Sequence, residues 1–483
     1  MFPAVISCNQ MGQAYKMSLL KTRLISPYQH TGVKWLLSRE RSNEYPGGFL
    51  CDEMGLGKTV QLLATMCYNP KPRTLIIVPK SIVSQWSSEV KKFTPHMNVS
   101  IYDGPNRALP DMSTNNLVVV CSYAISRDAE LHNYKWDRLI LDEAHEVRNP
   151  KTKTGSSVME YCADIRWLVT GTPVFNSMKD FVTLCCILGI PKSHTQCFKD
   201  NIRANYLLRR TKDDLGERLK LPPCDFQNLE LEMCPEELAL YRECFAACSV
   251  RVREIVAAGA EGRSQMEILE CFLRVRQVMA WPQLYLNGIA KKDDRDPEKW
   301  CGKSTKMDTL ISLIKSHPRE KSIVFTQFTG ELNHIKHLLT EEDIKVFVLD
   351  GHTDKDLREY NVNQFKKTVG ACVFLIQIKA GGVGLNLQEA TRVYITTPAW
   401  NPATELQAIS RAHRTGQTQK VIVRKLTYLG TEELPSIESS IMDLQGHKAA
   451  ITAEVLNDQK LVSQIPVVSS KISVRKVAKL FSV

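Results

Sequence analysis

Short runs of apolar and β-branched residues recur along the 483-residue chain in two separate series, and this pattern limits the fold more than any other feature. Buried parallel strands appear in a sequence as unbroken apolar runs, and longer stretches with helical spacing separate these runs. The first series comprises Gly48–Cys51, Thr74–Val78, Leu117–Ser122, Arg138–Leu141 and Trp167–Thr170. The second comprises Ser322–Thr326, Lys345–Leu349, Ala371–Ile376, Arg392–Thr396 and Val421–Leu426. We therefore predict an α/β protein with two lobes, each built on a parallel sheet.

The segments around the two series complete the predicted organisation. We expect a first lobe in residues 1–210, a helical insertion and linker in 211–305, a second lobe in 306–450 and a basic tail in 451–483. The insertion is predicted to be helical because its apolar residues recur at helical spacing. The end of the tail carries Lys471, Arg475, Lys476 and Lys479. It is interpreted either as a nucleic-acid contact or as a frayed amphipathic helix.

Charge and cysteine content narrow the class of protein. The chain has 63 Lys and Arg against 52 Asp and Glu, a net charge of +11, which favours an acidic polymer as partner without saying which one. Its 15 cysteines are scattered and form no C-x-x-C pair, so we expect free thiols and no zinc module. No apolar stretch is long enough to span a membrane, and the N-terminus does not resemble a secretory signal. We expect no membrane partner and no secretion.

The segment GGFLCDEMGLGKTVQ carries the clearest chemical signal. An apolar strand runs into Gly55, Gly57, Lys58 and Thr59 and then into a helical pattern, the context of a phosphate-binding P-loop. Backbone N–H groups at the helix start can surround phosphates, Lys58 can reach the β- and γ-phosphates, and the Thr59 hydroxyl can bind Mg²⁺. The general pattern has glycine where this chain has Asp52. From this segment alone, ATP binding is therefore one interpretation among others.

A second segment, WDRLILDEAHEVRNP, supplies acidic groups. Its apolar run ends in Asp142 and Glu143, which places two carboxylates at the carboxyl end of a strand, where α/β sheets build their sites. We predict that Asp142 holds Mg²⁺ and that Glu143 orients or deprotonates the attacking water. His145 is interpreted as a coupling residue that hydrogen-bonds across the site, because no other metal ligand lies at metal spacing.

These segments and others in the same order resemble the SWI/SNF-type family of superfamily 2 helicase-like ATPases, the motors of chromatin remodellers and DNA translocases. The resemblance runs from about Leu24 to Leu426 and includes LISPYQHTGVKWLL, DEMGLGKTVQ, LIIVPKSIVSQWSSEV, LILDEAHEVRNPKTK, RWLVTGTPVFN, LLRRTK, SIVFTQF, AGGVGLNLQEA and WNPATELQAISRAHRTGQ. Asp normally occupies the place of Asp52 in this family. The resemblance implies two tandem RecA-like lobes, with ATP and Mg²⁺ as cofactors.

The resemblance also implies roles for individual residues. Arg411 and Arg414 would act as arginine fingers, and their spacing predicts one shared helical face, which would otherwise be only a solvated surface. The nucleotide would contact Gln29, Met54, Gly55, Leu56, Gly57, Lys58, Thr59, Val60 and Gly382. Coupling between ATP state and lobe movement would involve His145, Thr170, Gly171, Thr172 and Gln407. Most relatives have Gln at the place of Phe175, which puts polar coupling at that position in doubt.

The resemblance further implies a DNA track across both lobes. DNA contacts are expected from Lys80, Ser81, Ser122, Tyr123, Gln327, Lys379, Gly381 and Trp400. Phosphate contacts of this kind give affinity without sequence specificity. For Trp86 we favour core packing over a DNA contact. Trp400 is open between a minor-groove contact and structural packing, because relatives have a second tryptophan where this chain has Ala399.

We expect a DNA-dependent ATPase that translocates on double-stranded DNA and displaces or remodels a DNA-bound protein such as a nucleosome or a transcription complex, without separating the strands. A strand-separating DNA or RNA helicase is the first alternative, and a weakly hydrolysing ATP-binding scaffold is the second. Compact motors of this type without accessory domains resemble those carried by large DNA viruses as well as the motor cores of cellular proteins. The expected location is therefore the nucleus, or a cytoplasmic virus factory.

Overall fold

The computed structural model describes residues 20–22, 24, 27–171, 178–197, 199–219, 221–259, 264–380, 385–431, 433–456 and 481. Two compact units are found along the chain, one within Met1–Lys220 and one within Leu221–Ala453.

The first unit is built on a parallel sheet with seven strands among the described residues, in the order β3-β4-β2-β5-β6-β1-β7. The strands are β1 Gly47–Leu50, β2 Arg73–Val78, β3 Asn98–Ile101, β4 Leu117–Ser122, β5 Trp136–Asp142, β6 Ala163–Val169 and β7 Leu207–Leu208. Every residue of β1 and β4 is buried, because a parallel sheet is covered on both faces.

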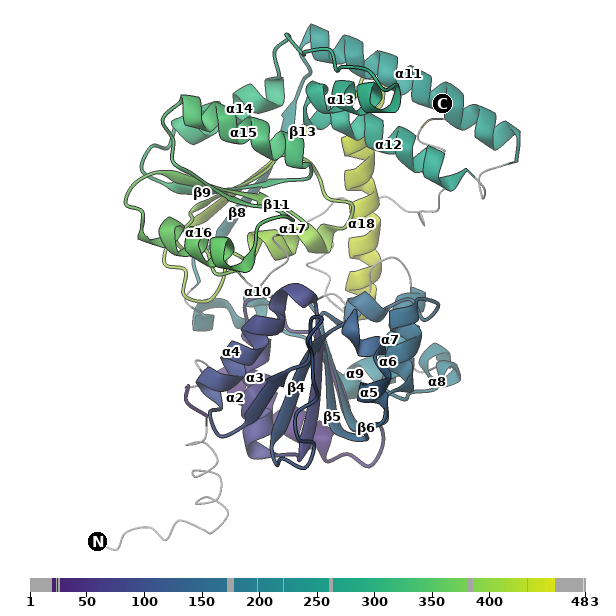
Figure 1. Ribbon diagram of the computed structural model, residues 1–483, viewed down its shortest axis with the longest axis vertical. Coiled ribbons are helices and arrows are strands. Elements are labelled where there is room, and N and C mark those ends of the chain that lie inside the picture. Colours follow the sequence, from purple (N-terminus) through teal and green to yellow (C-terminus); the bar gives the residue numbers. More distant parts are fainter. Residues whose placement is uncertain are drawn as a thin grey trace, which may run out of the picture. The chain divides into compact units, whose positions relative to one another are not determined.

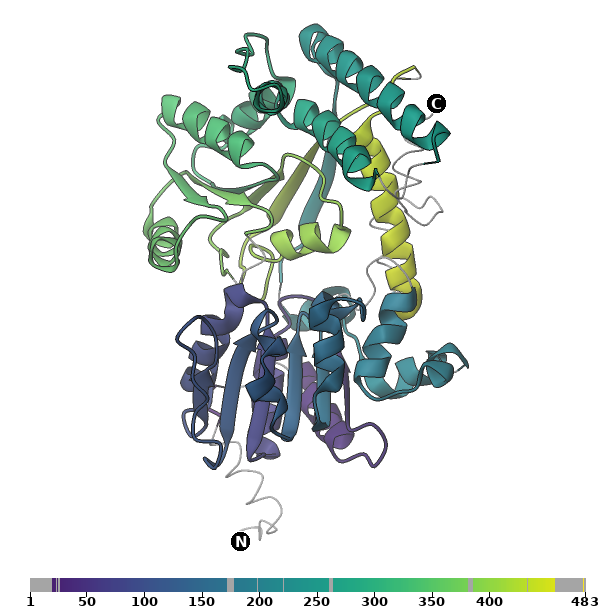
Figure 2. The same cartoon turned by 45° about the vertical axis from the view of Figure 1, so that its right-hand side comes forward.

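Helices supply that cover. They are α2 Pro27–Glu40, α3 Lys58–Tyr68, α4 Val83–Phe93, α5 Ala129–His132, α6 Lys153–Glu160, α7 Met178–Ile187, α8 Lys192–Cys197, α9 Lys199–Tyr206 and α10 Lys212–Leu215. Figures 1 and 2 show α2, α3 and α4 on one face of the sheet and α5, α6 and α7 on the other. Because all strands run the same way, β1 and β5 deliver the residues that follow them to one edge of the sheet.

The second unit has six parallel strands among the described residues, in the order β10-β11-β9-β12-β13-β8. They are β8 Cys224–Leu231, β9 Lys321–Thr326, β10 Val346–Leu349, β11 Cys372–Gln377, β12 Arg392–Ile395 and β13 Val421–Tyr428. Its helices are α11 Pro235–Ala257, α12 Gln265–Ala280, α13 Pro282–Lys292, α14 Thr305–Lys315, α15 Thr329–Glu341, α16 Lys355–Lys367, α17 Pro402–Ile409 and the part of α18 Ile437–Leu456 up to Ala453. Helices α11, α12 and α13 share one apolar cluster, which includes Tyr241, Phe272, Val275 and Tyr285.

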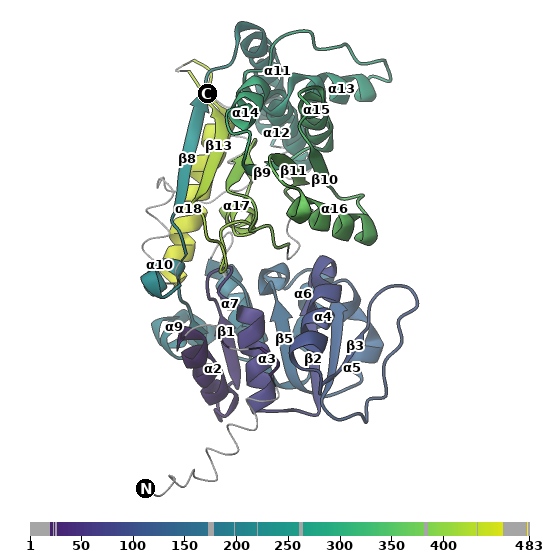
Figure 3. The same ribbon diagram turned by 90° about the vertical axis from the view of Figure 1, so that its left-hand side faces the viewer.

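The predicted α/β fold with two parallel sheets is confirmed, and each of the ten apolar runs overlaps a strand. The sequence interpretation missed β3, β7 and β8. Figure 3 shows β8 beside β13, which it pairs in parallel from Cys224 with Val421 to Leu231 with Tyr428. The sequence CDFQNLEL of β8 is an edge strand with exposed and half-buried positions, so it lacks the apolar run that marked the others.

A buried carboxyl group lies at the start of α15. Glu331 is fully buried, and its carboxyl group accepts hydrogen bonds from the backbone N–H groups of Gln327 at 3.2 Å and Phe328 at 3.4 Å and from the Thr396 hydroxyl. Burial raises its pKa to about 7, although these donors and Lys306 act in the opposite direction. The folded second unit therefore binds a proton at Glu331 more tightly than the unfolded chain does.

This proton makes stability depend on pH. Between the ordinary pKa of 4.5 and about 7, the native state holds more protons than the unfolded state, so Glu331 lowers stability as pH rises through this window. The unfolding free energy of Glu331→Gln, relative to that of wild type, should therefore be higher at pH 8 than at pH 5 by up to about 3 kcal/mol. Urea unfolding at both pH values checks this, with Glu341→Gln on the same helix as the exposed control. The prediction would be wrong if the difference in unfolding free energy between Glu331→Gln and wild type were the same at pH 5 and pH 8.

Candidate nucleotide site

The loop between β1 and α3 has the backbone of a phosphate-binding loop. Gly57 precedes α3 with φ 76° and ψ 43°, and Gly55 has φ 91°, a left-handed region that favours glycine. A Cβ atom on Gly57 would lie 2.6 Å from Nε2 of Gln29. The backbone conformation thus requires glycine at both positions, and the close approach of Gln29 requires it again at Gly57. With this loop conformation, the first N–H groups of α3 can bind an anion.

Two residues of α2 support this loop from behind. The Tyr28 hydroxyl donates to the carbonyl oxygen of Leu56 at 3.0 Å, and Gln29 Nε2 donates to the same oxygen at 3.3 Å. The Tyr28 ring is buried in a small cluster with Leu56 and Leu215. Tyr28 thus packs in the core, and Gln29 holds the loop, while the predicted contact of Gln29 with the nucleotide stays a prediction.

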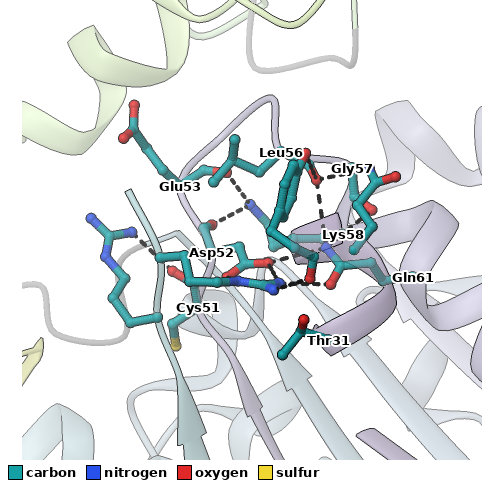
Figure 4. A network of polar contacts seen from close by, with 12 residues as sticks. Thr31, Cys51, Asp52, Glu53, Leu56, Gly57, Lys58 and Gln61 are labelled. Atoms are coloured by element: carbon teal, nitrogen blue, oxygen red, sulfur yellow. Dashed lines mark hydrogen bonds and ion pairs between the residues drawn. The ribbon is translucent and has the colours of Figure 1, made fainter. Parts of the chain in front are cut away.

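Lys58, the first residue of α3, turns its ammonium group back onto the loop. Its Nζ donates to the carbonyl oxygens of Asp52 at 2.8 Å and Glu53 at 3.5 Å (Figure 4). Burial lowers the pKa of Lys58, while the nearby carboxylates of Glu143, Asp52 and Asp142 oppose this shift. A phosphate group would replace neutral carbonyl partners by a charged one, which strengthens the interaction of the ammonium group.

Asp52 is joined to a residue far along the chain. Its fully buried carboxylate forms an ion pair with Arg210, whose Nε donates to Oδ1 at 2.9 Å. Gln61 of α3 donates to Asp52 Oδ2 at 3.0 Å (Figure 4). It also accepts from Arg210 Nη2 at 2.7 Å. Since Arg210 balances the charge of Asp52, Lys58 remains available for phosphate. Sequence reasoning missed this role of Arg210, although it lies in the quoted segment LLRRTK.

Asp142 is the last residue of β5, and the indole of Trp86 holds its carboxylate. Its Oδ2 accepts from Trp86 Nε1 at 2.7 Å and its Oδ1 from the N–H of Glu143 at 3.0 Å, while the Tyr123 hydroxyl donates to its carbonyl at 2.8 Å. Burial raises the pKa of Asp142 to about 6, and the charge of Glu143 adds to this effect. The preferred interpretation of Trp86 as a core residue is confirmed, and the ring also orients the carboxylate.

Glu143 has a backbone conformation that is rare for a residue with a side chain. Its φ of 51° and ψ of 49° lie in the left-handed region, which costs free energy and is common at functional sites. His145 Nδ1 lies 3.3 Å from Glu143 Oε2 and 3.5 Å from the Thr170 hydroxyl. His145 thus connects Glu143 with the end of β6, and its coupling role stays a prediction.

The predicted Mg²⁺ ligands are Thr59 and Asp142. Within the described residues, no group of three or more His, Cys, Asp and Glu side chains is arranged to hold a metal by itself. Mg²⁺ bound mainly by nucleotide phosphates and water needs only one or two protein oxygens. Burial and the charge of Glu143 both disfavour the ionised carboxylate of Asp142, and a Mg²⁺ ion that arrives with the nucleotide would offset this, so these residues fit such an ion.

Further predicted residues of the first unit lie at the same sheet edge. Thr170 is fully buried, and the carbonyl of Gly171 accepts from Arg209 Nη1 at 3.2 Å. Lys80 and Ser81 are exposed just before α4. Ser122 and Tyr123 are buried, and Ser122 Oγ donates to Asp103 Oδ1 at 2.5 Å, so their DNA contacts stay predictions. Met54 and Val60 are half-buried around the loop, and Thr172 lies outside the described residues.

In the second unit the predicted arginine pair does not lie on a helix. Helix α17 ends at Ile409, and Arg411 and Arg414 lie in the turns that follow, so the prediction of a shared helical face was wrong. The reason is local. Gly416 has φ 101°, and buried Gln417 donates to the carbonyls of Gln388, Ala390 and Ala412, which folds the chain back. Arg414 Nη1 donates to the carbonyl of Leu385 at 3.3 Å, within this turn region.

The other predicted residues of this unit are spread over its strand ends. Gln327 follows β9, Lys379 is exposed after β11, and Gln407 lies on α17. The Trp400 ring is half-buried and packs edge-on against Phe272 with ring centres 5.4 Å apart. Gly381 and Gly382 lie outside the described residues. None of the described helices is long and apolar enough to cross a membrane.

Comparison with known families identifies both parts of the chain. The SNF2-related domain matches residues 28–284, more than half of the sequence. The chain belongs to the SNF2-related family. The helicase conserved C-terminal domain matches residues 305–416 of the same SNF2-related chain. The resemblance recognised from sequence motifs is thereby confirmed, and the chain has the two parts of an SNF2-family ATP hydrolase core.

Relatives of this SNF2-related chain differ in length. An "Uncharacterized ATP-dependent helicase" of Mycoplasma pneumoniae is 28% identical over 93% of the chain and 44% of its own length. The "Probable global transactivator" of Orgyia pseudotsugata multicapsid polyhedrosis virus is 27% identical over 89% and 91%. Human "DNA excision repair protein ERCC-6-like" is 28% identical over 90% and 41%. The chain thus spans less than half of two of these relatives and most of the viral one.

A solved structure was also found to be similar. The Sulfolobus solfataricus SWI2/SNF2 ATPase core in complex with double-stranded DNA is 25% identical, with a TM-score of 0.41, over 96% of this chain and 98% of that one.

Proposed function

We propose that this chain is a DNA-dependent ATPase that moves along double-stranded DNA and remodels or displaces bound protein without separating the strands. One observation carries the proposal: Lys58 after β1, and Asp142 and Glu143 at the end of β5, come together at a single edge of the first sheet, where both carboxylates act on the pKa of Lys58. This is the arrangement of cation and carboxylates that phosphoryl transfer requires.

Each group has a role in ATP hydrolysis. Lys58 exchanges the loop carbonyls for the β- and γ-phosphates of ATP, and the glycine loop donates its N–H groups to them. Glu143, held by its left-handed backbone, orients the attacking water and accepts its proton. Thr59 and Asp142, the latter fixed by Trp86, would hold Mg²⁺, which would neutralise phosphate charge when bound. Arg411 and Arg414 supply further positive charge to the transferring phosphoryl group, and Gly382 completes the nucleotide contacts.

The choice of double-stranded DNA rests on family membership together with the printed names of relatives, one of which is a DNA excision repair protein. In the proposed track, exposed Lys80 and Lys379 bind phosphates, and Trp400 contacts the groove. A nucleosome or transcription complex is the proposed displaced protein. We propose an ATP-binding lobe in residues 1–210, a helical insertion and linker in 211–305, a second lobe that carries the arginines in 306–450 and a basic tail in 451–483.

A strand-separating helicase is the second candidate, favoured by the name of the Mycoplasma relative. The AHRTGQ segment at Ala412–Gln417 favours the translocase, because relatives that unwind RNA usually carry a Gln-Arg-x-Gly-Arg motif instead. A scaffold without turnover is disfavoured, since Lys58, Asp142 and Glu143 all have the partners described above. The proposed location is the nucleus or, for a viral source, a cytoplasmic virus factory. ATP-driven displacement of a triplex-forming strand, compared with unwinding of a forked duplex, tests the proposal.

A further inference from the structure

The segment Pro398–Asn401, between β12 and α17, is held from several sides at once. It contains Trp400, which in the proposed function contacts DNA. Among the described residues, its partners come from α12, α17 and α18, all within the second unit (Figure 1). Loops that carry functional side chains are often mobile, whereas precise contacts require that their supports be fixed.

Helix α12 holds this segment through two residues one turn apart. Arg276 Nη2 donates to the carbonyl oxygen of Pro398 at 3.0 Å. Phe272 packs edge-on against the Trp400 ring, with an angle of 84° between the ring planes. The Arg276 guanidinium also lies 5.9 Å from the centre of the Phe272 ring. Residues four apart share one helix face, so a single face of α12 fixes both the backbone and the indole of this segment.

Helices α17 and α18 hold Ala399 on both sides of its peptide unit. Its N–H donates to Glu405 Oε1 at 2.7 Å, and its carbonyl accepts from Gln445 Nε2 at 2.5 Å. The same Gln445 nitrogen donates to Glu405 Oε1 at 2.7 Å. Glu405 in turn forms a buried ion pair with Lys425 of β13 at 3.0 Å, with both side chains only 6% exposed. The carboxylate that fixes Ala399 is therefore itself fixed.

We propose that Arg276 and Gln445, with Phe272, are positioning residues that hold the Trp400 loop in one conformation for contact with DNA. This inference rests on the proposed function, since it assigns the loop a part in DNA binding. The contacts fix the backbone of the two residues before Trp400, and they fix the ring of Trp400 itself. The conformation of the loop thus exists before DNA arrives, and no binding energy is spent on ordering it.

The test uses the full chain and two readouts. The first is acrylamide quenching of Trp400, obtained as the difference between each protein and its Trp400→Phe counterpart. The second is the duplex DNA concentration that gives half-maximal ATPase stimulation, measured with kcat. Variants are Arg276→Gln, Arg276→Lys and Gln445→Leu. Arg274→Gln is the matched control, because Arg274 lies on the same helix but bonds Gln277 and Glu270 instead of the loop.

Arg276→Gln and Gln445→Leu should increase quenching of Trp400 and raise the half-saturating DNA concentration roughly tenfold, because displaced contact groups lose much of their effect. The value of kcat at saturating DNA should stay within about twofold, since no phosphate contact is lost. Arg276→Lys, which keeps a donor for Pro398, should recover most of the effect.

Two results would overturn the inference. If Arg276→Gln and Gln445→Leu behave like Arg274→Gln in quenching, these residues do not position the loop. If quenching increases but DNA half-saturation changes only in Trp400→Phe, the positioning has no functional effect. Absence of DNA stimulation in wild type would instead contradict the proposed function, and the quenching result would still decide whether the loop is held as described.

Discussion

ATP turnover at saturating duplex DNA should fall by a factor of about 10³ when Glu143 is replaced by glutamine, because a positioned general base contributes 10²–10⁴ to the rate. Glutamine keeps the size of the side chain and can retain a hydrogen bond to His145, which lies 3.3 Å away. It cannot accept a proton from water. Phosphate release measures turnover, and binding of a fluorescent ATP analogue should remain within about threefold, since the Lys58 loop is unchanged.

Glu146→Gln is the matched control for this experiment. Glu146 lies on the short helical turn Ala144–Val147 that Glu143 precedes, but its side chain is half exposed and reaches His145 only at 3.8 Å. Its turnover should stay within about twofold of wild type. Glu143→Gln turnover above one tenth of wild type would remove Glu143 from the mechanism. No turnover in wild type with or without DNA would favour the scaffold alternative.

Replacing Lys306 by methionine should destabilise the second unit by about 3–5 kcal/mol, because it leaves a buried carboxylate without its cation. Lys306 Nζ lies 2.7 Å from Glu438 Oε1, and both side chains are fully buried. The ammonium group also lies 4.7 Å from the centre of the Tyr428 ring. Helices α14 and α18 are joined by this pair. Urea unfolding followed by circular dichroism measures the loss.

The exposed pair Lys315–Glu342 gives the comparison for this prediction. Its atoms are 2.5 Å apart, but the side chains are 50% and 39% exposed, so Lys315→Met on the same helix should cost at most about 1 kcal/mol. Adding Glu438→Gln to Lys306→Met should restore part of the stability, since the amide oxygen still accepts from the Tyr428 N–H. Equal losses of unfolding free energy for Lys306→Met and Lys315→Met would show that the buried ion pair contributes no more to stability than the exposed one.

Local patterns predicted much of this molecule. Ten apolar runs became strands because burial on both faces of a parallel sheet demands an unbroken run. The phosphate-loop pattern around Gly57 and Lys58 and the carboxylate pair Asp142–Glu143 could be recognised because each is concentrated in a few consecutive residues. Pairing of Asp52 with Arg210 escaped prediction, because 158 residues separate the two and nothing in either segment specifies the contact.

The arginine segment shows a different limit of sequence reasoning. A spacing of three predicted a helical face for Arg411 and Arg414, whereas the glycine at 416 and the amide of Gln417 fold the chain into turns. Side-chain contacts with backbone carbonyls leave no periodic pattern in the sequence. The supports of the Trp400 loop are of the same kind: Arg276, Glu405 and Gln445 come from three helices and bond backbone atoms.

Displacement of a third strand from a DNA triplex tests the central claim most directly. A motor that moves along intact duplex removes the third strand while the duplex stays paired. We expect ATP-dependent displacement by wild type, its loss in Glu143→Gln, a steep decrease with added salt because phosphate contacts supply the affinity, and no unwinding of a forked duplex under the same conditions. Efficient unwinding of the fork, or failure to displace the third strand despite DNA-stimulated ATP hydrolysis, would contradict translocation on double-stranded DNA.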